Sequence, residues 1–317
     1  MCGCCNRSEA RLRRPPRPPT GSPAARHPEP FDSAAFGRYA QDRLRSAARS
    51  RGTPMHPFLS LPSPWLVAHR GGSALAPENT LAAFELAAEL GADAIETDVR
   101  RTRDGVVVIF HDETTERLTG APGTIEERTL AEVKALDAAA GFTRDGGRTH
   151  PRRGTGIAIP TFAEALARHP AMRFIVDAKA DDAALAEALA DAVRAAGAER
   201  RVCVGSFFDA QAERLGALLP GCARYLPQDA AKCHVLAALS GGDASSCPGG
   251  YELASLPARM GELQVVSPPV VAHFHARGMP VHAWTVDDAE EMRALLAVGV
   301  DAIVTDRPDV LRSVLGR

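Results

Sequence analysis

From residue 65 onward, short runs rich in β-branched and aromatic residues alternate with longer stretches rich in alanine and leucine. This alternation is typical of βα units around a parallel sheet. The predicted strands are residues 65–69, 93–99, 106–110, 173–178, 201–206, 222–226, 263–266, 281–286 and 301–304. The predicted helices are residues 80–90, 128–137, 161–168, 182–196, 208–217, 268–277, 288–297 and 308–315. The nine predicted strands exceed the eight of a TIM barrel by one. The runs 93–99 and 106–110 are joined by a connection too short for parallel neighbours, so one of them must run antiparallel. Eight parallel strands with eight helices then predict a (β/α)8 TIM barrel.

Local signals mark several boundaries between these elements. Asn79 is the predicted N-cap of the helix at 80–90, which ends at Gly91, and Thr161 with Glu164 has the spacing of a capping box. The stretch 141–159 is long, polar and rich in glycine. We expect it to form a mobile loop beside the active face.

The dipeptide Asp104-Gly105 lies between two β-rich runs and predicts a hairpin with a two-residue loop. Counting outward from that loop pairs Asp98 with His111, and Glu96 lies on the same face as Asp98. One surface is therefore predicted to carry two carboxylates and an imidazole, which suggests metal-assisted acid/base chemistry. The alternative is an ordinary solvated hairpin face that bears charges.

In a barrel of this class the active site is built where the strands end. Three carboxylates at these ends, Glu96, Asp98 and Asp177, repel one another unless a divalent cation lies between them, and all-oxygen ligands favour Mg²⁺ or Ca²⁺. Arg70 and Lys179 are then free to hold an anion such as a phosphate. The polar or aromatic strand ends are His69, Arg70, Glu96, Asp98, His111, Asp177, Lys179, Ser206, Trp284 and Asp306. Ser206 has no base near it in sequence, so it is interpreted as a strand-end hydrogen-bonding residue rather than a nucleophile.

Charge and composition divide the chain into two parts. Residues 1–54 hold eleven arginines against four acidic residues, whereas the remainder has 26 basic and 35 acidic residues. An acidic body argues against nucleic acid as a partner. We expect residues 1–60 to be a disordered, Arg/Pro-rich extension and residues 61–317 to be the barrel domain. Two alternatives remain for this extension. It is an arm that binds a polyanion, or the natural protein starts at Met55.

The chain has no uninterrupted apolar stretch long enough to suggest a membrane span, and no apolar stretch follows the basic residues as in a secretory signal. We therefore expect a cytoplasmic protein without stable membrane insertion. Its seven cysteines show no zinc spacing, and reduced thiols are the simplest assignment in that compartment. The oligomeric state stays open.

A set of short motifs resembles the glycerophosphodiester phosphodiesterase family in order and spacing, over about residues 65–312. The combination is specific, although each motif alone is weak. The motifs are His69-Arg70-Gly71, Pro77-Glu78-Asn79-Thr80, Glu96-x-Asp98, Asp104-Gly105, His111-Asp112, Ile159-Pro160-Thr161, Ser206-Phe207, Trp284-Thr285-Val286, Gly299-Val300-Asp301-Ala302 and Thr305-Asp306-x-Pro308.

The resemblance implies a phosphatidylinositol-phospholipase-like TIM barrel that cleaves glycerophosphodiesters to sn-glycerol 3-phosphate and an alcohol. In that family the glycerol 2-hydroxyl attacks phosphorus, and water opens the resulting cyclic phosphate. The implied roles are His69 and His111 as the acid/base pair, Glu96, Asp98 and Asp177 as ligands of one divalent cation, Arg70 and Lys179 as phosphate contacts, and Trp284 as a wall of the substrate site.

One residue departs from the family pattern, because Asp177 stands where the family usually has glutamate. The shorter side chain predicts weaker, but retained, metal binding. Two other functions remain open. The first is a lysophospholipase D-type enzyme, in which the 141–159 loop and an apolar rim would accept a lipid chain. The second is a barrel that has lost catalysis and serves as a binding module.

Overall fold

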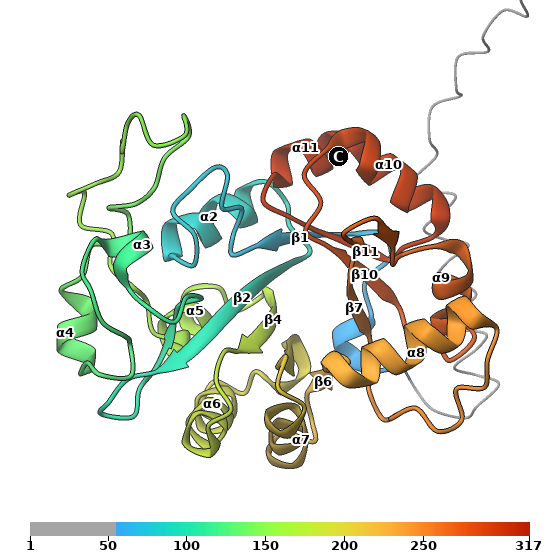
Figure 1. Cartoon of the computed structure of the whole chain (residues 1–317). Helices are drawn as coiled ribbons and strands as arrows, with labels where there is room; N and C mark the ends of the chain where they lie inside the picture. The colour runs from blue at the N-terminus through green and yellow to red at the C-terminus, as the bar shows by residue number, and fades with distance from the viewer. Residues whose placement is uncertain (1–54) are drawn as a thin grey trace, which may run out of the picture. The chain divides into compact units, whose positions relative to one another are not determined.

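A computed structural model describes residues 55–317, and within them eight parallel strands form a barrel (Figure 1). A bridge between Tyr225 and Leu253 joins the two ends of the sheet. The predicted TIM barrel is confirmed. In their order around the sheet the strands are β6 (Ala223–Arg224), β5 (Val202–Gly205), β4 (Arg173–Ala178), β2 (Ala94–Arg101), β1 (Trp65–His69), β11 (Ala302–Thr305), β10 (Val281–Trp284) and β7 (Ala254–Pro257).

Helices pack outside the sheet because each has one apolar face. In α6 (Ala183–Ala195) the buried residues recur at helical spacing, at Leu185, Leu189 and Val193 among others. None of the helices between residues 55 and 317 is both long and apolar enough to cross a membrane. The other α-helices are α2 (Leu81–Glu89), α3 (Glu116–Thr119), α4 (Leu130–Lys134), α5 (Phe162–Arg168), α7 (Asp209–Leu218), α8 (Gln228–Ser240), α9 (Pro268–His275), α10 (Ala289–Val298) and α11 (Pro308–Val314).

The interior of the barrel follows from the two-residue period of the strands. Val67, Ala94, Ile175 and Cys203 lie in one buried cluster, and the next inward-facing positions along their strands reach the mouth. A 3-10 helix, η1 (Pro57–Leu59), adds the fully buried Phe58 to this cluster. The described structure begins at residue 55, and most of the extension predicted for residues 1–60 lies outside the described residues.

One predicted strand was placed wrongly. Residues 263–266 do not belong to the barrel, because β9 (Leu263–Gln264) pairs only with β8 (Arg259–Met260) in a small antiparallel hairpin. The sixth barrel strand along the chain is β7, whose sequence Ala-Ser-Leu-Pro lacks β-branched residues and ends in proline, so its strand signal is weak. The helix α8, which precedes it, was also missed.

The hairpin after β2 has a three-residue loop, so the predicted register is wrong by one residue. Its second strand, β3 (Val107–Ile109), pairs Val99 with Ile109, and Thr102 N–H donates to Val106 O at 2.9 Å. Gly105 adopts a φ of 90°, as three-residue loops of this kind require. Phe110, not His111, therefore lies opposite Asp98.

The expectation of reduced cysteines is wrong for one pair, because Cys233 on α8 forms a disulfide with Cys247. Cys203 and Cys222 are free and buried, as expected of small apolar side chains. The three cysteines at positions 2, 4 and 5 lie outside the described part of the chain. A persistent disulfide is more typical of an oxidising compartment than of the cytoplasm.

Candidate active site

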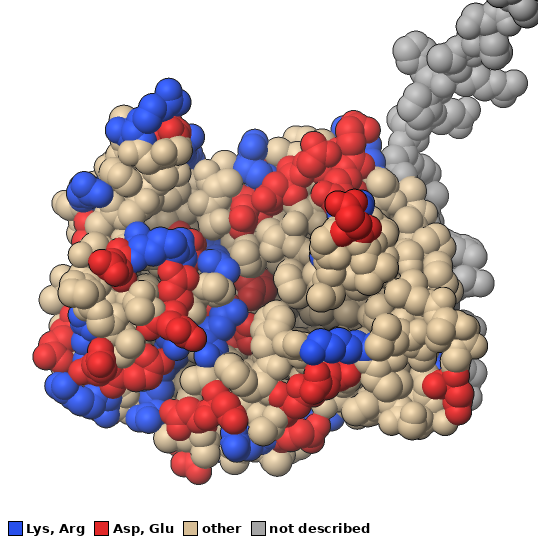
Figure 2. Space-filling view, viewed as in Figure 1, with Lys and Arg blue, Asp and Glu red and all other residues tan. Residues whose placement is uncertain are grey.

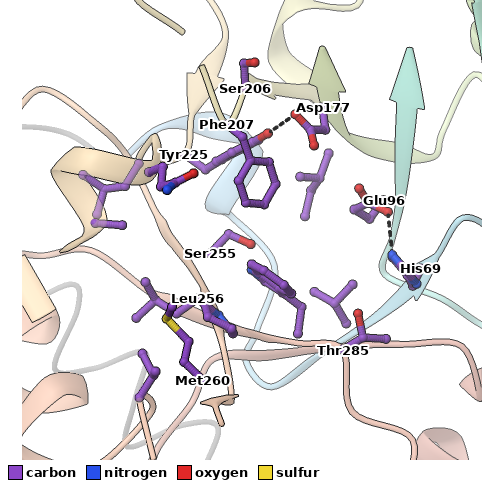
Figure 3. Close-up of a pocket in the computed structure, with 18 of the residues that line it drawn as sticks. His69, Glu96, Asp177, Ser206, Phe207, Tyr225, Ser255, Leu256, Met260 and Thr285 are labelled. Atoms are coloured by element: carbon purple, nitrogen blue, oxygen red, sulfur yellow. Dashed lines mark hydrogen bonds and ion pairs between the residues drawn. The ribbon is translucent and has the colours of Figure 1, made fainter. Parts of the chain in front are cut away.

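The mouth of the barrel opens into a cavity of about 780 Å³. Strand alternation directs polar side chains from neighbouring strands into it, and Figure 3 shows His69, Glu96 and Asp177 facing this space. All eight residues assigned roles from the sequence line the cavity: His69, Arg70, Glu96, Asp98, His111, Asp177, Lys179 and Trp284.

His69, the last residue of β1, is held by a carboxylate from the adjacent strand. Its Nδ1 lies 2.6 Å from Asp306 Oδ1, just beyond β11, and its Nε2 lies 3.8 Å from Glu96 Oε2. Burial works to lower the pKa of His69, but the hydrogen bond to Asp306 and the charge of Glu96 outweigh it, so that pKa is raised. Asp306 appeared in the sequence only as a polar strand end, without a role.

His111 has a similar arrangement with a different carboxylate. Its Nδ1 lies 2.7 Å from Asp112 Oδ1, and the Arg117 guanidinium binds both oxygens of Asp112 at 2.6 and 2.9 Å. Burial lowers the pKa of His111. Although burial opposes it, hydrogen bonds from Arg117 and His111 lower the pKa of Asp112 to about 2, so that this carboxyl group stays ionised.

Glu78 connects two arginines of this region, Arg70 and Arg117. It accepts hydrogen bonds from Arg70 at 2.8 Å and from Arg117 at 2.9 Å through both of its oxygens. Against the effect of burial, Arg117 and Arg70 lower the pKa of Glu78. The Glu78 carboxylate thus holds Arg70 at the cavity and, through Arg117 and Asp112, the ring of His111.

Asp98 is buried among positive and amide groups. Its Oδ1 lies 2.8 Å from Lys179 Nζ, and its Oδ2 accepts from Asn79 Nδ2 at 2.8 Å and lies 3.2 Å from Arg70 Nε. Despite burial, Lys179 and Arg70 lower the pKa of Asp98. Asn79 has a φ of 57° and is not the N-cap of α2; Thr80 is, because its hydroxyl accepts from Ala83 N–H.

Asp177 shares Lys179 with Asp98. Its Oδ2 lies 2.6 Å from Lys179 Nζ, and Tyr225 donates its hydroxyl to Oδ1 at 2.9 Å. Tyr225 can reach this position because Gly205 has no side chain, and a Cβ there would overlap the tyrosine ring. Tyr225 was not predicted as a site residue, since a single tyrosine after a two-residue strand carries no recognisable signal.

Glu96 is the carboxylate least compensated by its surroundings. Its Oε2 is buried without a hydrogen-bond partner, and burial beside Asp98 raises the pKa of Glu96 to about 7. A cation at this oxygen would remove that unfavourable state, so the pair Glu96 and Asp98 fits a hard divalent ion. Among the described residues, however, no three His, Cys, Asp or Glu side chains are placed to hold a metal together, because Asp177 and Asp98 converge on Lys179.

The opposite wall of the cavity is apolar. Trp284 packs edge-on against Phe207 with ring centroids 5.9 Å apart, and Lys179 Nζ lies 5.6 Å from the Phe207 ring. Ser206 is a strand-end hydrogen-bonding residue, as predicted, because its hydroxyl donates to Ala178 O at 2.7 Å. No residue of the 141–159 loop lines the cavity, so the loop forms no wall of it.

Known proteins provide an independent comparison. The family model described as the glycerophosphoryl diester phosphodiesterase family matches residues 69–310. A Mycobacterium tuberculosis protein named probable glycerophosphodiester phosphodiesterase 2 is 35% identical over 83% of this chain and 95% of its own length. A glycerophosphodiester phosphodiesterase of Caldanaerobacter subterraneus is 32% identical over 78% of this chain and 95% of its own length.

A solved structure agrees with these matches. An Oleispira antarctica phosphodiesterase, in complex with the product sn-glycerol-3-phosphate, superimposes with a TM-score of 0.63 at 26% identity, over 80% of this chain and 98% of the other. The motifs at the strand ends, the barrel and these similarities agree, and the chain belongs to the glycerophosphoryl diester phosphodiesterase family.

Proposed function

We propose that the cavity hydrolyses glycerophosphodiesters to sn-glycerol 3-phosphate and an alcohol, with His69 and His111 as the acid/base pair. The main support is that each imidazole is held through Nδ1 by its own carboxylate, Asp306 or Asp112. A carboxylate at Nδ1 fixes the tautomer and ring orientation, so that Nε2 is available to the substrate. The membership in an enzyme family makes the inactive binding barrel the weaker alternative.

Cleavage of a phosphodiester requires a neutralised phosphate, a deprotonated nucleophile and a protonated leaving group. Arg70 and Lys179 lie at the cavity with positive charge for the phosphoryl oxygens. As the bond from the glycerol 2-oxygen to phosphorus forms, one imidazole accepts the hydroxyl proton, and the other protonates the departing alcohol oxygen. Water then opens the cyclic phosphate with the two imidazoles in exchanged roles.

We further propose that the site binds one divalent cation, Mg²⁺ or Ca²⁺. Glu96 and Asp98 would hold it, and Asp177 would join them once Lys179 turns from that carboxylate to the substrate phosphate. When bound, such an ion lowers the pKa of the attacking hydroxyl and offsets charge on the phosphoryl oxygens. Trp284 forms part of the wall that keeps water from the reacting groups.

The proposed binding partner is a small-molecule glycerophosphodiester substrate. The cytoplasmic location stays a prediction, and the Cys233–Cys247 disulfide argues against it.

The test is release of sn-glycerol 3-phosphate from glycerophosphocholine by the full chain, with Mg²⁺, Ca²⁺ or EDTA. We expect cation-dependent release that falls by about a hundredfold or more in His111→Ala, as for loss of a general acid or base. The matched control is His150→Ala, since His150 lies in the 141–159 loop and does not line the cavity. Equal activity of the two variants, or release unaffected by EDTA, would contradict the proposal.

A further inference from the structure

The cavity has a second, apolar half that a small polar substrate would leave empty. Figure 3 shows His69 and Glu96 on one side of the space and Leu256 and Met260 on the other. The apolar half is built by α8 and residues 254–265, the part of the barrel that differs most from the sequence prediction. Its apolar lining residues are Leu226, Ala231, Val235, Leu236, Leu256, Pro257, Met260, Leu263 and Val265.

Large apolar side chains are also exposed at this edge of the molecule. Among the described residues, six large hydrophobic side chains are exposed, and four of them line this one cavity: Phe207, Leu236, Met260 and Leu263. Leu236 is 65% exposed and Met260 is 59% exposed. Figure 2 shows the hollow with charged side chains along its left edge and mainly uncharged surface on its right. Clustered exposed apolar side chains beside a cavity indicate a binding surface for an apolar group.

The charged residues of the apolar half do not supply a polar binding site. Lys232 forms an ion pair with Asp229 on its own helix at 3.1 Å, and Arg259 donates to Gln264 across the small hairpin at 2.8 Å. Both therefore have partners of their own, and their alkyl stems add to the apolar wall. The volume of about 780 Å³ lies near the upper end of the ~300–1,000 Å³ typical of pockets for drug-sized ligands. A small polar glycerophosphodiester is smaller than such a ligand.

We propose that the enzyme acts on single-chain phospholipids, with the acyl chain of a 1-acyl glycerophosphodiester lying between α8 and the β8–β9 hairpin. This inference rests on the proposed function and specifies its substrate class. A 1-acyl substrate keeps the free 2-hydroxyl, so the same step proceeds: the bond from the 2-oxygen to phosphorus forms, and the bond to the head-group alcohol breaks. Water then opens the cyclic phosphate, and the products are 1-acyl-glycerol 3-phosphate and the alcohol. A diacyl phospholipid has no free 2-hydroxyl and is not a substrate.

The first test compares glycerophosphocholine with 1-acyl lysophosphatidylcholines of increasing chain length, all below their critical micelle concentrations, by choline release. Each buried methylene strengthens binding by up to about fourfold, so we expect kcat/KM to rise with chain length until the groove is filled. Phosphatidylcholine is expected to release no choline. A flat chain-length profile, with glycerophosphocholine cleaved normally, would overturn this inference and leave the proposed function intact. No cleavage of either substrate would overturn both.

The second test uses two leucines of the same helix. In Leu236→Asn we expect the ratio of kcat/KM for the longest lysophosphatidylcholine to that for glycerophosphocholine to fall by about tenfold or more. Leu239→Asn is the matched control, because Leu239 is also exposed on α8 but does not line the cavity, and its ratio is expected to stay at the wild-type value. Met260→Asn tests the opposite wall and is expected to behave like Leu236→Asn. Equal ratios in the Leu236 and Leu239 variants would contradict the placement of the chain.

Discussion

Replacement of Asp306 by asparagine tests whether the proposed acid/base pair, His69 and His111, depends on its carboxylate partners. The His69 Nδ1 to Asp306 Oδ1 distance is 2.6 Å, and the two side chains are 18% and 25% exposed. A hydrogen bond to a charged partner in such a setting contributes about 1.5–3 kcal/mol. The contribution is largest when the ring carries a proton during the reaction. Because about 1.4 kcal/mol corresponds to a tenfold change in rate, Asp306→Asn should lower kcat about tenfold to a hundredfold.

The assay is steady-state release of sn-glycerol 3-phosphate from glycerophosphocholine at saturating cation, with kcat and KM determined separately. Asp309→Asn is the matched control, because Asp309 pairs with Arg307 and does not line the cavity. That variant should keep the wild-type kcat. If Asp306→Asn keeps kcat within about threefold of the wild type, or raises only KM, Asp306 does not position a catalytic imidazole, and the reasoning is wrong.

Three further changes test other parts of the structure. Arg117→Gln removes the hydrogen bonds to Glu78 and Asp112 and should lower kcat about threefold to tenfold, with partial recovery in Arg117→Lys, which keeps the charge but not the two-pronged geometry. Burial lowers the pKa of His282 to about 4, so between about pH 6.5 and pH 4 this histidine is protonated in the unfolded chain but not in the folded protein. As the pH is lowered through that range, the free energy of unfolding should therefore fall by about 3 kcal/mol. His282→Leu should remove this part of the pH dependence in urea titrations. Reduction of the Cys233–Cys247 disulfide, which spans 14 residues, should lower the free energy of unfolding by about 3 kcal/mol, measured with and without reductant.

Controls for these changes come from the same chain. Arg168→Gln removes an exposed ion pair with Glu85 outside the cavity and should leave kcat unchanged, so an equal loss in Arg117→Gln and Arg168→Gln would dismiss the positioning role of Arg117. Parallel pH curves for the wild type and His282→Leu would show that the buried ring is not the group that titrates. If non-reducing mass spectrometry finds a free thiol at Cys233 in the wild-type protein, the disulfide does not contribute to the free energy of unfolding, and that prediction is wrong.

Much of the barrel and of the candidate site could be predicted from local patterns in the sequence. Strand alternation brings Glu96, Asp98 and Asp177 to one mouth, because every second residue of a barrel strand faces inward and neighbouring strands end at the same side. The capping box at Thr161 was also predicted correctly, since its hydrogen bonds join residues three apart in the sequence. The hairpin register failed because the side chain of Thr102 bonds to both Asp104 and Val106, which lengthens the loop by one residue.

The tertiary structure alone decided which groups support the site. His69 and Asp306 are 237 residues apart, and they meet only because β1 and β11 are neighbours in the closed barrel. The hydroxyl of Tyr225 reaches Asp177 through space left by Gly205, and the apolar wall depends on how α8 and the β8–β9 hairpin fold over the mouth. Residue types and their spacing along the chain were thus sufficient to predict which side chains meet at the cavity. Apart from Asp112, which follows His111 directly in the chain, their main partners depend on distances between separate elements, which no local pattern in the sequence encodes.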